Sequence, residues 1–269
     1  MVRAFWLTLI FCVVLSADAM EQVRKLMSPE AFESHRKLLS LLFENGGSYC
    51  DATGCDMGRI VKTLEENGLM DLRLPPGSEV TLTMSCEGKH PFFFMKTVDD
   101  TLHAAGLGGY LTRDAALGGE GFRWSVAYTA ASAPDPVRLV ERFARRGVRV
   151  EAIERLDAAR WRYRLDMRDA TLPATKIVPG ESRRIVRPVR PLWLGVAGVR
   201  RLTIRELPGS HWYADVVVYD KMLHILSMKQ NDTRTRYVRL RLPKEAVYVK
   251  ITDRFTLENI RSGLRVDAR

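Results

Sequence analysis

The pattern of apolar residues in this chain changes once, across residues 171–191, and that change constrains the fold more than any other feature. Before it, stretches with the 3.6-residue period of helices alternate with stretches of period two. After it, residues 192–269 contain only short strand patterns, separated by turns such as Pro208-Gly209. Prolines and arginines crowd residues 171–191, which predicts a linker. Short strands at regular spacing are typical of a β-sandwich, so we expect an all-β sandwich over 192–269.

The residues before the linker predict an α+β region. Ser28-Pro29-Glu30 supplies the cap, the proline and the acid that begin helices, and a second helix is expected over about 56–67. Residues 20–90 are therefore expected to form a helical segment followed by a strand over 80–86. Within 91–170, strands are expected over 92–98, 110–113, 122–130, 148–153 and 161–167, and helices over 99–105 and 136–146. Strand, helix, strand, strand, helix, strand is the order of a ferredoxin-like, split βαβ unit. We therefore expect a ferredoxin-like domain over 91–170.

The last of these strands alternates strictly. Its apolar residues are Trp161, Tyr163, Leu165 and Met167, and between them lie Arg160, Arg162, Arg164 and Asp166. Successive side chains of a strand point to opposite faces. One face of this strand is therefore expected to pack on a core and the other to lie in solvent.

Residues 1–19 have the three parts of a secretory signal peptide. Arg3 gives a basic start, residues 4–16 are apolar, and Ala17-Asp18-Ala19 supplies the small residues of a cleavage site. Cleavage after Ala19 would export the chain, most simply to a bacterial periplasm. The apolar stretch is shorter than the roughly 20 residues that cross a bilayer. No later stretch is long and apolar enough, so we expect no transmembrane segment after cleavage.

Export permits disulfides, and three cysteines follow the signal peptide: Cys50, Cys55 and Cys86. Cys50 and Cys55 flank a turn-like stretch in which a local disulfide is possible, but the separation of their Cα atoms decides whether it forms. Their spacing is not that of a CxxC redox or zinc motif. Cys86 falls in phase with the apolar residues of the strand before it, which predicts a buried thiol.

The excess positive charge lies at the C-terminal end. The whole chain has a net charge of +10 at pH 7, and residues 171–269 hold 20 Lys and Arg against 9 Asp and Glu, a net of +11. Hydrophobic residues make up 46% and charged residues 28% of the chain, which is ordinary for a globular protein and excludes a disordered or collagen-like one. Such a concentrated field favours an anionic partner.

Strand alternation predicts where that partner would bind. Tyr237, Arg239 and Arg241 should point outward from one strand, and Tyr248 and Lys250 from the next, with a hairpin over 243–246 between them. Guanidinium groups bind carboxylates and phosphates, and the rings could stack on sugars. Trp212, beside His211 and Tyr213, is a further candidate for a sugar platform. The alternative interpretation is that these are ordinary residues of a solvated sheet face.

The sequence lacks the common motifs of catalysis and cofactor binding. It contains no GxxxxGK[ST], HExxH, GxSxG or CxxC motif. Ser210, His211 and Asp215 resemble the members of a triad only by type, because neighbours on an extended segment point to opposite faces. The histidines have no spacing typical of metal ligands. We therefore expect no cofactor, no metal and no catalytic residues.

These observations favour an exported, non-enzymatic protein of the cell envelope that binds an anionic glycan or an acidic protein through its C-terminal sandwich. A hydrolase acting on envelope polysaccharide or peptide, with catalytic residues from distant positions, is the alternative. Contact with an anionic membrane surface is a third hypothesis, although no amphipathic helix supports it. Nucleic acid is not expected as a partner, because no recognition motif is present and an exported protein meets little of it.

Overall fold

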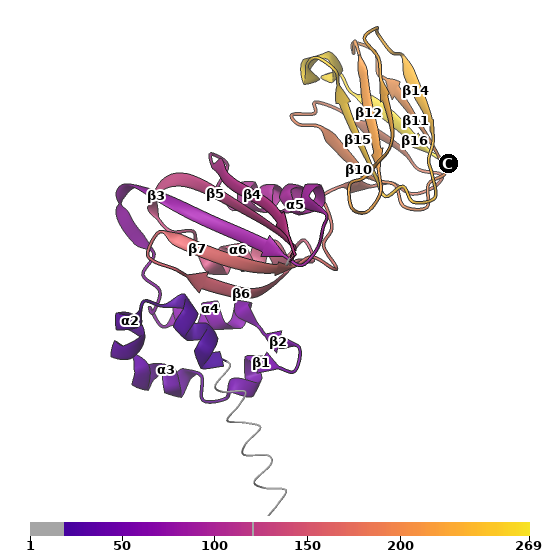
Figure 1. The fold of residues 1–269 in the computed structure, drawn as a ribbon. Helices are drawn as coiled ribbons and strands as arrows, with labels where there is room; N and C mark the ends of the chain where they lie inside the picture. Colours follow the sequence, from indigo (N-terminus) through magenta and orange to yellow (C-terminus); the bar gives the residue numbers. More distant parts are fainter. Residues whose placement is uncertain (1–18, 120) are drawn as a thin grey trace, which may run out of the picture. The chain divides into compact units, whose positions relative to one another are not determined.

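The computed structural model describes residues 19–119 and 121–269, which fall into two compact units, one ending at Thr171 and the other spanning Leu172–Arg269. Figure 1 shows both units, which we describe separately. The predicted signal peptide lies, apart from Ala19, outside the described residues. No helix among the described residues has the length and apolar character needed to cross a bilayer.

The N-terminal unit combines small helices with one sheet. Residues 19–26 are helical. The elements that follow are α2 (Pro29–Ser34), α3 (Arg36–Leu42), η1 (Gly46–Ser48), β1 (Cys50–Asp51), β2 (Gly54–Cys55), α4 (Met57–Glu66), β3 (Arg73–Cys86), α5 (Pro91–Ala104), β4 (Leu111–Gly118), β5 (Gly121–Ser132), α6 (Pro136–Ala144), β6 (Arg149–Arg155) and β7 (Arg160–Asp166).

Local sequence signals explain where the helices begin. Ser28 accepts a hydrogen bond from the Ala31 amide at the start of α2, and Asp56 accepts one from the Arg59 amide at the start of α4. Asp135 caps α6 in the same way, just before Pro136. The predicted helices at these three places are present.

The five strands β3 to β7 form one sheet in the order β4-β5-β3-β7-β6. β3 lies at its centre, antiparallel to β5 and parallel to β7. α5 and α6 pack on each other, and α6 also contacts β6. On β7, Trp161, Tyr163 and Leu165 are buried and the arginines between them are exposed, so the predicted alternation of this strand is confirmed.

The strand predicted over 92–98 is wrong, because residues 91–104 form the single helix α5. Its buried side chains include Phe93, Phe94, Val98 and Leu102, which recur at helical spacing. A short aromatic run reads equally well as a buried strand, and Pro91 at the first helical position was the signal that decides between the two. The ferredoxin-like unit expected over 91–170 is not confirmed, because the sheet takes β3 as its central strand and has five strands.

The C-terminal unit consists of β-strands with one short 3-10 helix. Its elements are β8 (Thr175–Lys176), β9 (Ser182–Ile185), β10 (Leu192–Gly195), β11 (Arg201–Glu206), β12 (Ala214–Tyr219), β13 (Ile225–Gln230), β14 (Tyr237–Arg241), β15 (Tyr248–Asp253), η2 (Leu257–Ile260) and β16 (Leu264–Ala268). The predicted β-rich C-terminal region is confirmed.

Two sheets build this unit, one of five strands in the order β13-β12-β15-β10-β8 and one of four in the order β14-β11-β16-β9. Alternate residues of both sheets are buried in one shared core. Leu194, Val216 and Val249 come from the first sheet, and Leu202, Val238 and Val266 from the second. Every second residue of the four-stranded sheet consequently points away from the core into solvent.

Part of the segment expected as a linker over 171–191 lies in these sheets. β8 pairs with β10, and β9 pairs with β16. The prolines of the segment flank the two strands and do not interrupt them, so each backbone amide that the pairing needs is present.

Candidate anion-binding face

The structure divides the six predicted binding residues among three environments. Tyr237, Arg239 and Arg241 lie on β14 of the four-stranded sheet and are exposed. Tyr248 and Lys250 lie on β15 of the five-stranded sheet. The predicted hairpin between these strands is wrong, because β14 pairs with β11, and β15 pairs with β10 and β12.

The hairpin prediction failed because residues that face a core shared by two sheets can come from either sheet. Val238 on β14 and Val249 and Ile251 on β15 are all buried in the same cluster. A period-two pattern requires only that such residues face the core, and strands in opposite sheets meet that requirement as well as neighbours in one sheet.

Two predicted residues are structural. Trp212 is fully buried in the core, and its indole Nε1 donates a hydrogen bond of 2.9 Å to the Thr252 carbonyl. The Tyr248 side chain is buried, and its hydroxyl accepts a 3.2 Å hydrogen bond from the Leu172 amide. Trp212 is therefore no sugar platform, and Tyr248 belongs to no exposed patch.

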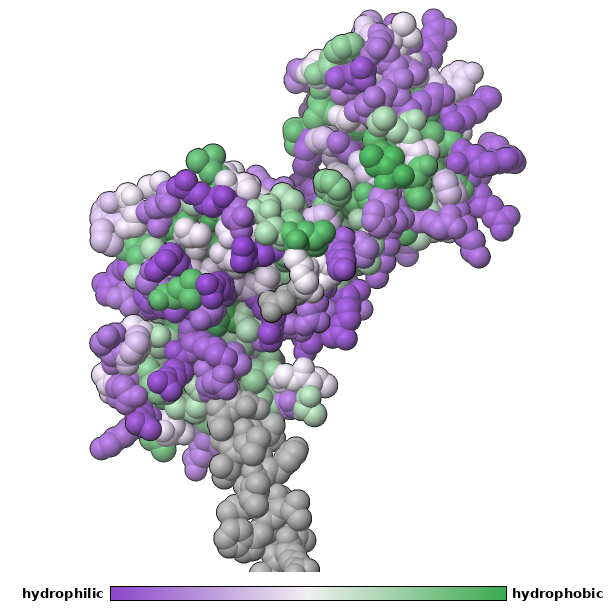
Figure 2. Space-filling model, in the orientation of Figure 1, coloured by the Kyte–Doolittle hydropathy of each residue, from purple (hydrophilic) through white to green (hydrophobic). Residues whose placement is uncertain are grey.

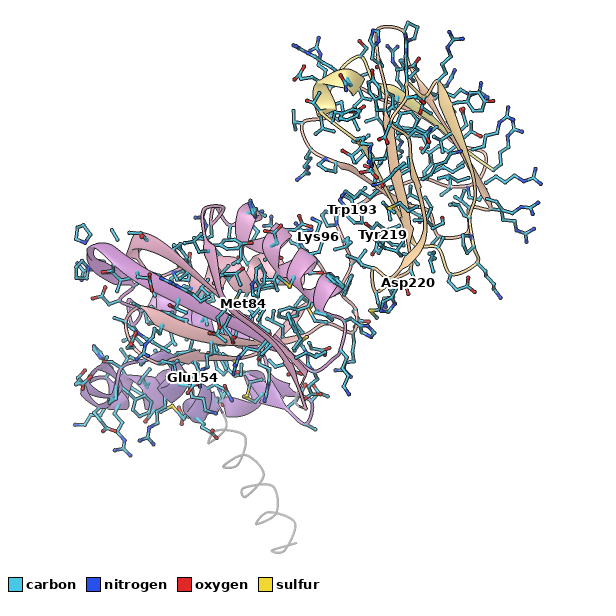
Figure 3. All side chains as sticks on the ribbon, turned by 45° about the horizontal axis from the view of Figure 1, so that its top comes forward. Met84, Lys96, Glu154, Trp193, Tyr219 and Asp220 are labelled. Atoms are coloured by element: carbon cyan, nitrogen blue, oxygen red, sulfur yellow. A yellow bond between two sulfur atoms is a disulfide. The ribbon has the colours of Figure 1, made fainter. Side chains whose placement is uncertain are left out.

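Four predicted residues remain. Lys250 is half-buried on the five-stranded sheet and lies apart from the others. Tyr237, Arg239 and Arg241 belong to a larger cationic surface. On the outward side of the four-stranded sheet we define the arginine face by residues that share this side: Arg184 on β9, Arg201 and Arg205 on β11, Tyr237, Arg239 and Arg241 on β14, and Arg265 on β16. All seven are exposed. Figure 3 shows nitrogen-tipped side chains projecting from this side of the C-terminal unit, and Figure 2 shows it as strongly hydrophilic.

The sheet register places arginines directly opposite one another. Arg201 pairs with Arg241, Arg205 with Arg265, and Arg265 with Arg184. Like charges directly opposite on neighbouring strands destabilise a sheet. The face therefore has an electrostatic cost that bound anions would relieve.

Few carboxylates offset that charge. In the described part of the chain, Asp267 is the only acid that forms an ion pair with an arginine of this face, at 3.7 Å from both Arg205 and Arg265. Its carboxylate also accepts a 2.6 Å hydrogen bond from the Ser182 hydroxyl. Arg184, Arg201, Arg239 and Arg241 lack such a partner among the described residues.

Tyr237 gives the face an exposed ring. The guanidinium carbon of Arg239 lies 5.0 Å from its ring centroid, within the range of a cation–π contact. The Tyr237 side chain remains 53% exposed, which leaves ring surface available to a ligand.

Sequence reasoning missed Arg184, Arg201, Arg205 and Arg265. The signal was the alternation already used for β14: Arg201, Thr203 and Arg205 alternate with Leu202 and Ile204, which are buried. What the sequence did not give was the order of the strands, which joins these residues into one surface.

The residues that resembled a catalytic triad are not assembled. Ser210 is buried, and its hydroxyl donates to the Gly263 carbonyl at 3.0 Å. Asp215 accepts a hydrogen bond from the Gln230 side chain at 3.2 Å. No group of three or more potential metal-ligating side chains occurs within residues 19–119 and 121–269.

The cysteines take two different states. Cys50 and Cys55, the pair left open by the sequence, form a disulfide between β1 and β2. Cys86 is a buried thiol, as expected, and burial raises its pKa to about 11. A thiol with such a pKa is protonated near neutral pH and is a poor nucleophile.

Comparison with known proteins gives little beyond this geometry. No protein-family model and no curated protein matches the chain. Among solved structures, the chain is similar to the pre-peptidase C-terminal domain of a collagenase from Bacillus anthracis, with 7% sequence identity and a TM-score of 0.27, over 37% of this chain and 99% of that domain.

Proposed function

We propose that this protein is an exported binding protein of the cell envelope, whose C-terminal unit binds an anionic glycan or an acidic protein through the arginine face. The observation that carries the proposal is the set of cross-strand arginine pairs, Arg201–Arg241, Arg205–Arg265 and Arg265–Arg184, with Asp267 as their one acidic partner among the described residues.

The chemistry of arginine supports an anion as the ligand. A guanidinium keeps its charge at all physiological pH values and presents donors in a planar fork that matches carboxylate and phosphate oxygens. Arginine is also less strongly hydrated than lysine, so less solvation is lost on binding.

The shape of the face supports an extended ligand. Four strands about 4.8 Å apart give a surface roughly 15 Å across, with the arginines distributed over all of it. Such a surface suits a polymer with repeated charges. The exposed ring of Tyr237 at one side supports a glycan in particular, because aromatic rings stack on the apolar faces of sugars.

We further propose that residues 1–19 are removed on export and that the protein acts in the periplasm. The Cys50–Cys55 disulfide supports this, since disulfides persist in oxidising compartments. We also propose a sandwich fold for the C-terminal unit and a split βαβ origin for the N-terminal sheet. Two observations support the split βαβ origin: the element order β3, α5, β4, β5, α6, β6, and the place of β5 between β3 and β4 in the sheet. In this interpretation β7 is an added strand.

The test is binding of the mature protein to polygalacturonate, a carboxylated glycan, at low ionic strength. The double variant Arg239→Gln/Arg241→Gln is expected to bind about tenfold more weakly, because two charge-assisted contacts are lost. Its matched control is Arg162→Gln/Arg164→Gln, which removes two exposed strand arginines from the other unit and should change binding little.

Salt supplies a second check on the same proteins. The Debye length falls from about 10 Å at 0.1 M salt to about 3 Å at 1 M, so binding by the native protein should weaken steeply over that range, and neutral dextran should not bind. Equal binding by the native protein and the Arg239/Arg241 variant would remove the proposal. Stronger binding to polyglutamate than to polygalacturonate would favour the acidic-protein form of it.

A further inference from the structure

The C-terminal unit has a hollow beside the arginine face. It lies at one end of β9, and its lining residues are Arg184, Val186, Arg187, Pro208, Arg261 and Ser262. Its volume is about 560 Å³, within the roughly 300–1,000 Å³ of sites that hold small ligands.

Three arginines from two segments of the chain line this hollow. Arg184 belongs to β9, Arg187 to the turn after it, and Arg261 to the residues that follow η2. A direct backbone hydrogen bond of 3.0 Å, donated by the Arg187 amide to the Arg261 carbonyl, holds these two segments together. The hydroxyl of Ser262 adds a neutral donor to the same lining.

Arg187 is held in an unusual backbone conformation. Its φ angle is 50°, in the left-handed region that residues with a side chain occupy at an energetic cost. Glycine would occupy that position at little cost. Strained residues of this kind cluster where a side chain has to be placed for binding.

Little negative charge opposes these three arginines. In the described part of the chain, their one ion pair joins Arg261 to Glu258 at 3.6 Å, and both of those side chains are mostly exposed. Exposed pairs of this kind contribute little energy and exchange readily. Arg184 and Arg187 take part in no ion pair among the described residues.

We infer that this hollow binds a phosphate monoester carried by the glycan of the arginine face, an inference that rests on the proposed function. Three guanidinium groups and a hydroxyl match a group with two negative charges and three acceptor oxygens better than they match a carboxylate, which has one charge and two oxygens. Arg184 lies on both surfaces, so one ligand can occupy them together.

The experiment is calorimetric titration of the mature protein with glucose 6-phosphate and inorganic phosphate, with sulfate and glucuronate as competing chemistries. Arg187→Gly removes the guanidinium while keeping a residue that accepts the left-handed backbone, and should weaken phosphate-ester binding about tenfold. Arg261→Gln should do the same by a change that leaves the backbone alone. Arg190→Gln, an exposed arginine of the same segment outside the hollow, is the matched control and should change binding by less than twofold.

The outcomes separate this inference from the proposed function. Arg239→Gln/Arg241→Gln should weaken polygalacturonate binding and spare glucose 6-phosphate, whereas Arg187→Gly should do the reverse. If Arg187→Gly and Arg261→Gln both fold and bind glucose 6-phosphate as the native protein does, the inference is wrong whatever the polymer binding. Binding of glucuronate as tight as that of glucose 6-phosphate would also overturn it. Binding to phosphatidic acid vesicles without binding to glucose 6-phosphate would overturn the sugar source of the phosphate.

Discussion

Two strands of this protein alternate arginine with buried residues, and the two have different electrostatic surroundings. On β7, Arg162 pairs with Glu154 at 3.3 Å and Arg164 with Glu151 at 3.1 Å, both acids lying on the neighbouring β6. On β14, Arg241 lies opposite Arg201, and Arg239 lies opposite Thr203. The difference teaches that the adjacent strand, and not the arginine pattern itself, determines whether such a surface is internally neutralised or available to a ligand.

The same contrast extends to the ends of the strands. Asp166, at the end of β7, lies 2.5 Å from Arg168 and 3.3 Å from Arg149. On the arginine face, Asp267 is the one acid among the described residues that pairs with an arginine, at 3.7 Å from both Arg205 and Arg265. The ion pairs between β7 and β6 are therefore expected to stabilise the folded protein. The arginine face is expected to bind a ligand and to lower the stability of the fold.

The difference between the two surfaces can be removed by adding an acid to the arginine face. Tyr237→Glu places a carboxylate opposite Arg205 and two residues from Arg239 on the same side. Binding to polygalacturonate at low salt should fall about tenfold, because the new carboxylate competes for these guanidiniums and repels the ligand. Tyr237→Gln is the control that removes the ring without adding charge, and it should have a smaller effect. Equal losses in both variants would assign the contribution to the ring.

The stability of the surface formed by β6 and β7 can be tested through Asp166. Hydrogen bonds from Arg168, and also from Arg149, hold the pKa of this carboxyl well below its ordinary value. Because the folded-state pKa is lowered, the stabilisation is present above the unfolded-state pKa near 4 and is lost as the pH falls below it. Asp166→Asn should lower the free energy of unfolding by about 1–2 kcal/mol at pH 7.

Denaturant unfolding of both proteins between pH 7 and pH 3 measures this effect. The difference between the native protein and Asp166→Asn should shrink as the pH falls through 4. Glu87→Gln, at an exposed carboxylate of the same unit, is the control and should alter stability by about 0.5 kcal/mol or less. A difference that stays constant with pH would show that the ion pairs of Asp166 are not its source.

The smallest expected effect comes from removing the ion pairs of the surface formed by β6 and β7. Glu151→Gln/Glu154→Gln removes the acidic partners of Arg162 and Arg164. Introduced into the Arg239→Gln/Arg241→Gln protein, this change should raise polygalacturonate binding about threefold at low salt, since two guanidiniums gain access to the ligand. Unchanged binding would show that unpaired strand arginines are not sufficient and that the geometry of the four-stranded sheet matters as well.

Much of the local structure could be predicted from the sequence, because it depends on neighbours along the chain. The capped starts of α2, α4 and α6 and the alternation of β7 follow from residues within one or two turns or one strand. The buried state of Cys86 followed from its phase on β3. Helix starts, strand alternation and the burial of one cysteine depend on nearby residues, so they can be predicted from the sequence alone.

The candidate site could be predicted only in part, because it depends on which strands become neighbours. The outward positions of Arg239 and Arg241 on β14 were visible in the alternation. Their separation from Lys250 was not, since a strand that faces the core has the same pattern in either sheet. The joining of β11, β14, β16 and β9 requires long-range pairing that a single sequence does not specify.

The position of β14 has a further consequence for how the molecule behaves in concentrated solution. It ends the four-stranded sheet, so the backbone groups on its outer side have no strand beside them among the described residues. An exposed edge strand can pair with the edge strand of a second copy of the protein. Positive charges along the edge oppose this pairing, because the two copies repel each other. Arg239 and Arg241 are therefore expected to oppose self-association. Variants that lack them should be examined by light scattering before a loss of binding is ascribed to the ligand.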